Sequence, residues 1–147
     1  MGIGQGYLQA TPAQLALATA LMASRGRTPK PHLLSEARDV LTGKTVLRNE
    51  ATVEATVSDV PDAHWQEVVL AMREVMHGPF GTARRSTQGA AYESAGKTGT
   101  AQVVGIAQNA TYRAEELAEE FRDHALFIAF APFDAPRIAV AIIIENG

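Results

Sequence analysis

The sequence predicts an α+β domain in which an antiparallel sheet packs against helices. Three observations predict this fold class: an apolar helical stretch near the start, an amphipathic helical stretch in the middle, and two apolar strands joined by a proline-bearing turn near the end. Helices combined with strands that are neighbours in sequence are typical of an antiparallel sheet. The 147 residues amount to about one domain. Hydrophobic residues, 46% of the total, supply enough apolar surface for folding, so disorder is not expected.

The first helix is expected to begin at Thr11 and Pro12. A threonine hydroxyl can cap free amides, and proline fits the first helical position. The helix should end at Ser24 or Arg25, before Gly26. Apolar residues surround it almost completely, so other elements should cover most of its sides.

The second helix is expected from Asp62, as its cap, to His77, where Gly78 and Pro79 end it. Its apolar residues follow the spacing i, i+3, i+4, i+7 of an amphipathic helix: Trp65, Val68, Val69, Met72, Val75 and Met76. Between the two helices, residues 27–59 carry prolines, charges and short alternating stretches. They predict a loop region with a small hairpin strand near residues 44–47.

The second half of the chain predicts three strands. The first covers residues 92–104, and a short exposed acidic helix is expected over residues 113–122 in the connection that follows. Strands over residues 124–131 and 137–145 should form a hairpin, because only five residues join them. Both are apolar at nearly every position, so we expect helices to cover both faces of the sheet.

Composition excludes several classes of function. The formal net charge is -3 and no basic run exceeds Arg84-Arg85, which argues against binding to nucleic-acid phosphates. Cysteine is absent and the four histidines lack metal-ligand spacing, so we expect no metal and no cofactor. The longest apolar run, residues 138–144, is shorter than the roughly twenty residues that span a bilayer. The chain as written is therefore expected to be soluble.

Residues 94–103 contain Lys97-Thr98-Gly99-Thr100 and are open to three interpretations. A Walker A phosphate loop is rejected, because Ala91 occupies the place of its first glycine and a strand, not a helix, should follow. A tight turn or plain strand without chemistry is the second. The third is an anion-binding strand, in which an ammonium and hydroxyls bind a carboxylate, glycine admits a substrate to the backbone, and an amide stabilises an oxyanion.

The third interpretation makes a demand on geometry. Strand alternation places Lys97 and Thr98 on opposite faces, whereas Thr98 and Thr100 share one. The three can serve one site only if the strand twists at an edge of the sheet and the long lysine side chain curls around. An edge strand could also pair with an extended peptide.

Four segments, in the same order along the chain, resemble the class B penicillin-binding proteins, and within them the elongation transpeptidases of Gram-negative bacteria. They are residues 2–16, 81–83, 96–103 and 123–132, and with them the likeness covers nearly the whole chain. The resemblance implies a partial transpeptidase fold of the β-lactamase-like type. It also implies a D,D-transpeptidase that cross-links peptidoglycan stem peptides through a serine acyl-enzyme.

The resemblance assigns roles by motif position. Lys97, Thr98 and Gly99 would form the carboxylate-binding strand, and Thr100 would donate an amide to the oxyanion hole. The implied partners are the peptidoglycan stem peptide, β-lactam antibiotics and, in the intact protein, elongation-complex proteins of the cell wall. The intact enzyme would be anchored in the inner membrane, with its catalytic domain in the periplasm.

The other two motifs of that family are missing. No Ser-x-Asn occurs, and the one Ser-x-x-Lys, from Ser94 to Lys97, overlaps the strand motif. On a helix this spacing puts both side chains on one face, but on a strand it sends them to opposite faces. Ser94 is therefore expected to be a decoy, and the nucleophile is not in this chain.

We expect residues 1–147 to be a C-terminal fragment of a transpeptidase domain, inactive by itself. The glycine-rich stretch 2–6 directly after Met1 also suggests a fragment, since such a turn normally joins two elements. The alternative is a non-catalytic peptide-binding or interaction module. If the truncation removes neighbouring strands, the apolar strand 137–145 would expose an unpaired edge, which predicts a dimer or strand-swapped assembly of the isolated chain.

Overall fold

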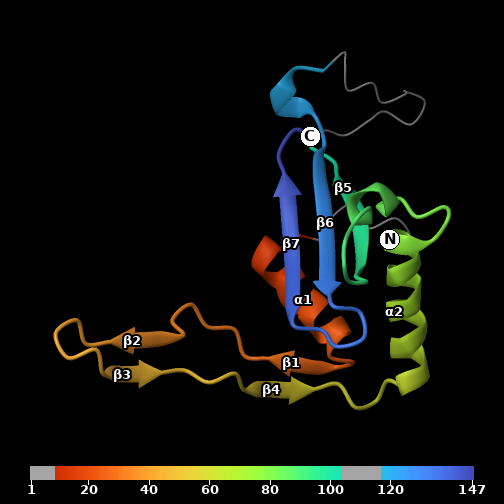
Figure 1. Cartoon of the computed structure of the whole chain (residues 1–147). Coiled ribbons are helices and arrows are strands. Elements are labelled where there is room, and N and C mark those ends of the chain that lie inside the picture. The colour runs from red at the N-terminus through yellow and green to blue at the C-terminus, as the bar shows by residue number, and fades with distance from the viewer. Residues whose placement is uncertain (1–8, 104–116) are drawn as a thin grey trace.

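The computed structural model describes residues 9–103 and 117–147. They form a body of helices and a three-stranded sheet, from which a long arm, residues 27–56, extends (Figure 1). In chain order the elements are α1 (Pro12–Ala23), β1 (Arg27–Pro29), β2 (Glu36–Arg38), β3 (Thr45–Arg48), β4 (Val53–Thr56), α2 (Asp62–His77), η1 (Arg84–Thr87), β5 (Ala95–Ala101), η3 (Glu119–Phe121), β6 (His124–Ala131) and β7 (Ile138–Ile144), where η marks a 3₁₀ helix. The predicted α+β class with an antiparallel sheet is confirmed.

The body is built on an antiparallel sheet in the order β5-β6-β7. Gly96 lies opposite Ala129, and Ala129 lies opposite Val140, so these three residues cross the sheet on one face. The hairpin of β6 and β7 is where the sequence predicts it, and β6 has the predicted bounds. Strand β5 is shorter than residues 92–104: it begins three residues later and ends at Ala101.

Helix α1 begins and ends close to the predicted residues. The Thr11 hydroxyl accepts a hydrogen bond from the Gln14 amide at 3.2 Å, and the Gln14 side chain accepts one from the Thr11 amide at 2.8 Å, which together make a capping box. Thr19 is buried, and its hydroxyl donates to the Leu15 carbonyl at 2.7 Å. The helix packs mainly against β7, with further contacts to β6, β1 and α2.

Helix α2 has the predicted bounds, but its start differs in detail. Pro61 occupies the cap position and makes no side-chain cap bond, so the prediction that Asp62 caps the helix is wrong. Asp62 is the first helical residue, where its negative charge interacts favourably with the helix dipole. It also forms a salt bridge with Arg25 at 3.2 Å. Gly78 ends the helix as predicted.

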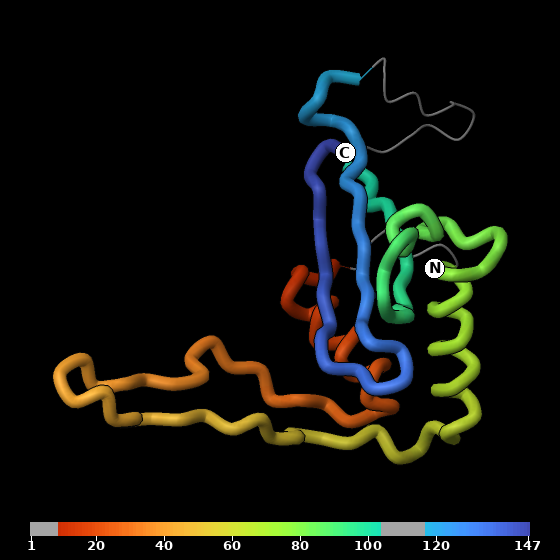
Figure 2. Tube along the Cα trace, in the orientation of Figure 1, coloured from red at the N-terminus to blue at the C-terminus, as the bar shows by residue number. Residues whose placement is uncertain are grey.

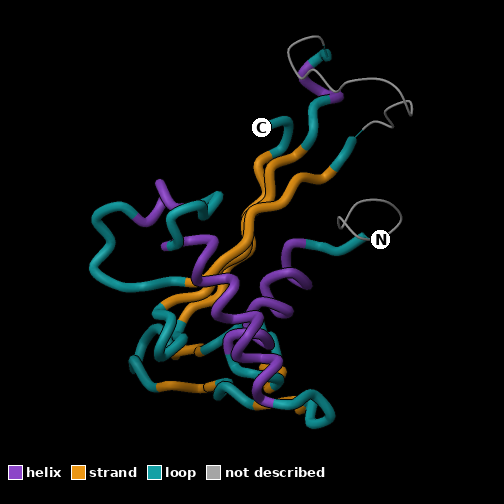
Figure 3. Tube along the Cα trace, turned by 90° about the vertical axis from the view of Figure 1, so that its right-hand side faces the viewer, coloured by secondary structure: helices purple, strands orange, loops and turns teal. Residues whose placement is uncertain are grey.

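The core lies where both helices meet one face of the sheet. Val69 and Met72 of α2 pack with Ala95 of β5 and with Phe130 of β6, which is 1% exposed. Partly buried residues surround this cluster, among them Ala23 of α1 and Ile128 and Ala139 of the sheet. Figure 3 shows the strands nearly edge-on, with α1, the helix that follows the N-terminal trace, to one side of them.

The other face of β7 stays open. In the part of the chain that the structure describes, Ile138 is 64% and Ile144 is 58% exposed, and Val140 and Ile142 between them are also exposed. The prediction that helices cover both faces is therefore wrong for these residues. An apolar strand sequence indicates that the strand favours burial, but it does not indicate which segment packs on each of its faces.

In the arm, two lengths of the chain run side by side (Figure 2), and their pairing is more regular than the sequence predicts. The hairpin near residues 44–47 is present, since β3 pairs with β2 and places Leu47 opposite Ala37. A second ladder between β1 and β4 places Thr28 opposite Ala55, where only loop is expected. At the arm's tip, the Asp39 carboxylate accepts hydrogen bonds from backbone amides, Gly43 has a φ of 68°, and β3 and β4 are exposed throughout.

Two further points concern the remaining segments. Residues 113–116 of the expected acidic helix and residue 104 of the expected strand lie outside the described residues, and Glu119–Phe121 forms a single 3₁₀ turn. Among the helices described, none is long and apolar enough to cross a membrane.

Candidate functional site

Strand β5 carries Lys97, Thr98, Gly99 and Thr100 at the edge of the sheet. Within residues 9–103 and 117–147, its ladder partner is β6, on one side only. The strand begins buried at Ala95 and Gly96 and then emerges: Lys97, Gly99 and Thr100 are exposed and Thr98 is half-buried. The expected edge position is therefore observed, and the four residues are accessible to a ligand.

The Lys97 side chain bends back onto the strand backbone. Lys97 lies opposite Ile128 and Thr98 opposite Phe127, so the two side chains leave opposite faces of the strand. The Lys97 ammonium nevertheless donates a hydrogen bond to the Thr98 carbonyl at 2.7 Å. The charge thus lies against the strand backbone beside Thr98 and not beyond the far face.

Thr82 is a neighbour of this strand that sequence reasoning missed. Its hydroxyl oxygen lies 3.1 Å from that of Thr98, within hydrogen-bond distance. Thr82 belongs to the segment 81–83, which carries part of the family resemblance but had no role assigned. The signal that could have pointed to it is the hydroxyl between glycine and alanine in a segment shared with the family.

The loop that holds Thr82 is fastened to the end of α2. The amides of Gly78 and Ala83 donate to the carbonyls of Glu74 and Val75, at 2.8 and 3.1 Å. The next carbonyl, that of Met76, accepts the Thr87 hydroxyl at 2.8 Å. A Cβ at position 81 would lie 2.4 Å from the Val75 carbonyl oxygen, so the close approach of this loop to the helix requires glycine.

Glycines in β5 allow close packing on both neighbours. A Cβ on Gly96 would lie 2.7 Å from the Ile128 carbonyl oxygen and 3.0 Å from the Met76 sulfur. At Gly99 the nearest atom to such a Cβ would be the Leu126 Cβ, at 3.3 Å. The close packing of α2 and β6 therefore requires glycine at position 96. At Gly99 the lack of a side chain leaves the strand backbone exposed at the edge of the sheet.

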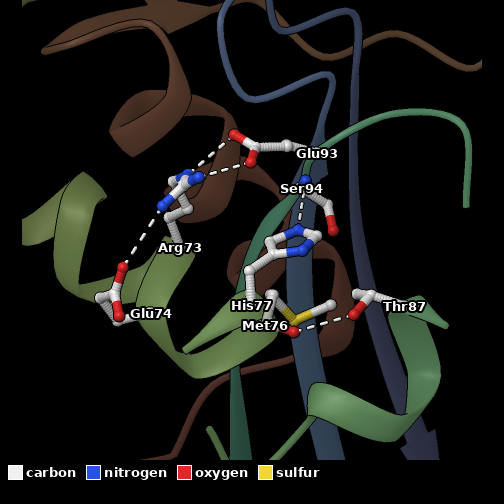
Figure 4. A network of polar contacts seen from close by, with 7 residues as sticks. All are labelled: Arg73, Glu74, Met76, His77, Thr87, Glu93 and Ser94. Atoms are coloured by element: carbon white, nitrogen blue, oxygen red, sulfur yellow. Dashed lines mark hydrogen bonds and ion pairs between the residues drawn. The ribbon is translucent and has the colours of Figure 1, made fainter. Parts of the chain in front are cut away.

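A polar network ties the beginning of β5 to α2 (Figure 4). Arg73 donates two hydrogen bonds to the Glu93 carboxylate, one of 2.8 Å and one shorter, and also pairs with Glu74 at 3.3 Å. The hydrogen bonds from Arg73 lower the pKa of Glu93, with burial acting in the opposite direction. The Arg73 guanidinium also lies 5.6 Å from the centroid of the Phe133 ring, in the β6–β7 connection.

His77 makes the second tie between the same two elements. The amide of Ser94 donates a hydrogen bond to its Nε2 at 3.0 Å (Figure 4). Sequence spacing could not reveal this contact, because the two residues are 17 positions apart. Both contacts involve the two residues that lead into the strand, so they fix the position of the end of β5 that is nearest to Lys97.

Ser94 itself lies in a setting unlike that of a helical Ser-x-x-Lys. It is 7% exposed and precedes the strand, and it lines a cavity of about 630 Å³ with Phe127, Ala129 and Val140. Lys97 instead bonds to the Thr98 carbonyl. In the described part of the chain, His, Asp and Glu form no group of three that could hold a metal ion.

Comparison with known proteins extends over the entire chain. Residues 1–147 match the family model for the penicillin binding protein transpeptidase domain. The peptidoglycan D,D-transpeptidase MrdA of Escherichia coli K12 is 43% identical over 148 residues, which cover 100% of this chain and 23% of the relative. MrdA of Acinetobacter baumannii is 40% identical over 147 residues, which cover 100% of this chain and 21% of the relative. The chain thus spans less than a quarter of the length of these curated relatives.

Solved structures agree with this comparison. Pseudomonas aeruginosa PBP2 in complex with WCK 5153 has a TM-score of 0.72 and 41% identity, covering 100% of this chain and 28% of that one. Helicobacter pylori PBP2 in its complex with MreC has a TM-score of 0.71 and 28% identity, covering 98% of this chain and 22% of that one. The imipenem acyl-enzyme complex of Mycobacterium tuberculosis penicillin-binding protein A has a TM-score of 0.71 and 26% identity, with coverage of 98% and 28%. The resemblance inferred from the sequence is confirmed: the chain belongs to the family of penicillin-binding protein transpeptidase domains.

Proposed function

We propose that this chain is the part of a peptidoglycan D,D-transpeptidase domain that carries its carboxylate-binding strand. The observation that carries the proposal is the accessible edge strand with Lys97, Thr98 and Gly99 in a member of this family. Relatives that share 43% and 40% of its residues are peptidoglycan D,D-transpeptidases. The intact protein would cross-link stem peptides through a serine acyl-enzyme.

The chemistry proposed for the strand follows from its groups. The Lys97 ammonium and the Thr98 hydroxyl bind the terminal carboxylate of a stem peptide or the carboxylate of a β-lactam, since charge-assisted hydrogen bonds to carboxylates are strong. Gly99 leaves the backbone open for the ligand, which can lie along the edge of the sheet. The Thr100 amide helps to stabilise the oxyanion formed when the acyl carbonyl is attacked.

The attacking serine is assigned to a part of the intact protein outside these 147 residues. Ser94 is buried ahead of the strand, and its amide is used by His77. A chain without the Ser-x-x-Lys helix and the Ser-x-Asn motif would bind β-lactams weakly and form no covalent adduct. Residues 1–147 are accordingly proposed to be a C-terminal portion of the transpeptidase domain.

Partners and location are proposed from the relatives. Helicobacter pylori PBP2 forms a complex with MreC, and a Mycobacterium tuberculosis relative forms an acyl-enzyme with imipenem. Elongation-complex proteins of the cell wall and β-lactams are therefore the partners we assign to the intact protein, in addition to the stem peptide. We place its catalytic domain in the periplasm, with an anchor in the inner membrane.

The test is intact-mass spectrometry after incubation with a penicillin. The intact protein should gain one penicillin per molecule, and the 147-residue chain should gain none. A stoichiometric adduct on the isolated chain would overturn the assignment of Ser94. If the intact protein gains no adduct, the alternative of a non-catalytic peptide-binding module is favoured, and an upstream gene sequence without Ser-x-x-Lys and Ser-x-Asn would support it.

A further inference from the structure

We propose that His77 is a positioning residue for strand β5, and that it acts by accepting a hydrogen bond from the Ser94 amide. The inference concerns the side chain of the last residue of α2, to which the family motifs assign no role. It rests on the proposed function only for its effect on acylation. Its effect on the strand itself stands on geometry.

The Ser94 amide depends on His77 because water has little access to it. Ser94 is 7% exposed, and its amide donates to the His77 Nε2 at 3.0 Å. A buried amide that loses its acceptor destabilises the structure around it by its full desolvation cost. The other tie to α2, through the carboxylate of Glu93, is made by a side chain that is 51% exposed, so solvent can replace part of that contact.

The contact sets the tautomer of the imidazole. Because the Ser94 amide is a donor, the Nε2 atom must carry a lone pair, and the ring proton resides on Nδ1.

The consequence for the candidate site follows from the short path along the strand. Ser94 is three residues before Lys97, and Ala95 and Gly96 between them are buried in the core. Loss of this hydrogen bond would loosen the end of β5 that places the lysine. The effect should be on how fast a penicillin acylates the intact protein and not on whether the domain folds.

The experiment compares three variants of the purified intact protein with the wild type at neutral pH. His77→Leu removes the acceptor. His77→Gln supplies an amide oxygen that can accept the same hydrogen bond. His64→Gln is the matched control, because His64 is an exposed residue of the same helix. The measurements are hydrogen exchange of the Ser94 amide and the rate constant of acylation by a fluorescent penicillin.

In His77→Leu, protection of the Ser94 amide should be about tenfold lower than in the wild type and in His64→Gln, the size expected for losing one buried hydrogen bond. In His77→Gln protection should stay close to that of the wild type. Acylation should be slower in His77→Leu than in the wild type, and His77→Gln should restore it. Equal Ser94 exchange in His77→Leu and wild type would overturn the proposal, as would Ser94 exchange in His77→Gln as fast as in His77→Leu.

The two proposals can fail separately. If no variant and no wild-type protein reacts with penicillin, the proposed function fails, and Ser94 exchange still decides the role of His77. If penicillin reacts and Ser94 exchange is the same in all variants, the role of His77 fails and the proposed function stands.

Discussion

The two edges of the sheet differ in chemistry and in attachment. At one edge, β5 presents Lys97, Gly99 and Thr100, and its beginning is held by Arg73 and His77 of α2. At the other edge, β7 presents a row of isoleucines with one valine, and in the described residues α1 covers only its inner face. A charged, glycine-containing edge discourages addition of another sheet, whereas an apolar edge invites it. The first edge is suited to a polar extended ligand, and the second to a protein strand.

The most severe test of the β5 edge is removal of its charge. Lys97→Ala in the intact protein should reduce the rate constant of acylation by penicillin by about 100-fold, because the ligand carboxylate loses its cationic partner. The rate is measured with a fluorescent penicillin under pseudo-first-order conditions. Lys44→Ala, at an exposed lysine near the tip of the arm, is the control and should leave the rate unchanged. A rate for Lys97→Ala within twofold of wild type would remove Lys97 from the site.

The β7 edge is tested by adding a charge to it. The 147-residue chain should self-associate through β7. Ile142→Lys should raise the dissociation constant of this self-association by about tenfold, because burying an unpaired ammonium is costly. Light scattering over a range of concentrations measures both. Val46→Lys, on the exposed strand β3 of the arm, is the matched control. Monodisperse monomer in the wild-type chain at high concentration would contradict the prediction.

The hydroxyl pair at the β5 edge should have a smaller effect. Thr98→Val should slow acylation by several-fold, as one hydrogen bond to the ligand is lost, and Thr82→Val should slow it less, because Thr82 acts through Thr98. A double variant that is no slower than Thr98→Val would show that the two hydroxyls act together. Additive losses would indicate that Thr82 contacts the ligand by itself.

The smallest effect is expected for the exposed tie between Glu93 and Arg73. Arg73 lowers the pKa of Glu93, so the ionised carboxylate stabilises the folded state above the pKa that Glu93 has in the unfolded chain. This stabilisation is lost as the pH falls through the lower, folded-state pKa. Glu93→Gln should therefore lower the melting temperature at pH 7, and the difference from wild type should shrink toward pH 3. Glu54→Gln, on the exposed strand β4, is the control, and a difference that grows in acid would contradict the sign.

Local sequence signals predicted most of the body of this fold. The threonine and proline at the start of α1, the 3.6-residue periodicity of α2 and the two apolar runs of β6 and β7 each depend on residues close in sequence, and each is confirmed. The ladder of β1 and β4 was missed because β1 has three residues, one of them Pro29, and its register shifts at that proline. Such a strand has no periodicity to detect.

The candidate site divides in the same way. The edge position of β5 and a curled lysine were conditions that alternation set for an anion-binding strand, and the roles of Lys97 to Thr100 came from the family resemblance. The contacts of Thr82 and His77 join residues 16 and 17 positions apart, and they arise only when α2 packs beside β5. No local pattern encodes such a contact, since the partner of each side chain is set by the packing of whole elements.

The last turn of α2 has a consequence for how this region unfolds. Three successive carbonyls, those of Glu74, Val75 and Met76, are occupied by groups of the following segment, from Gly78 to Thr87. Detaching that segment would leave all three acceptors without a partner at once, so we expect that the segment does not detach one residue at a time. Helix end and segment are expected to open as one cooperative unit, in which the amides of Gly78 and Ala83 become accessible to solvent together with the final turn of the helix.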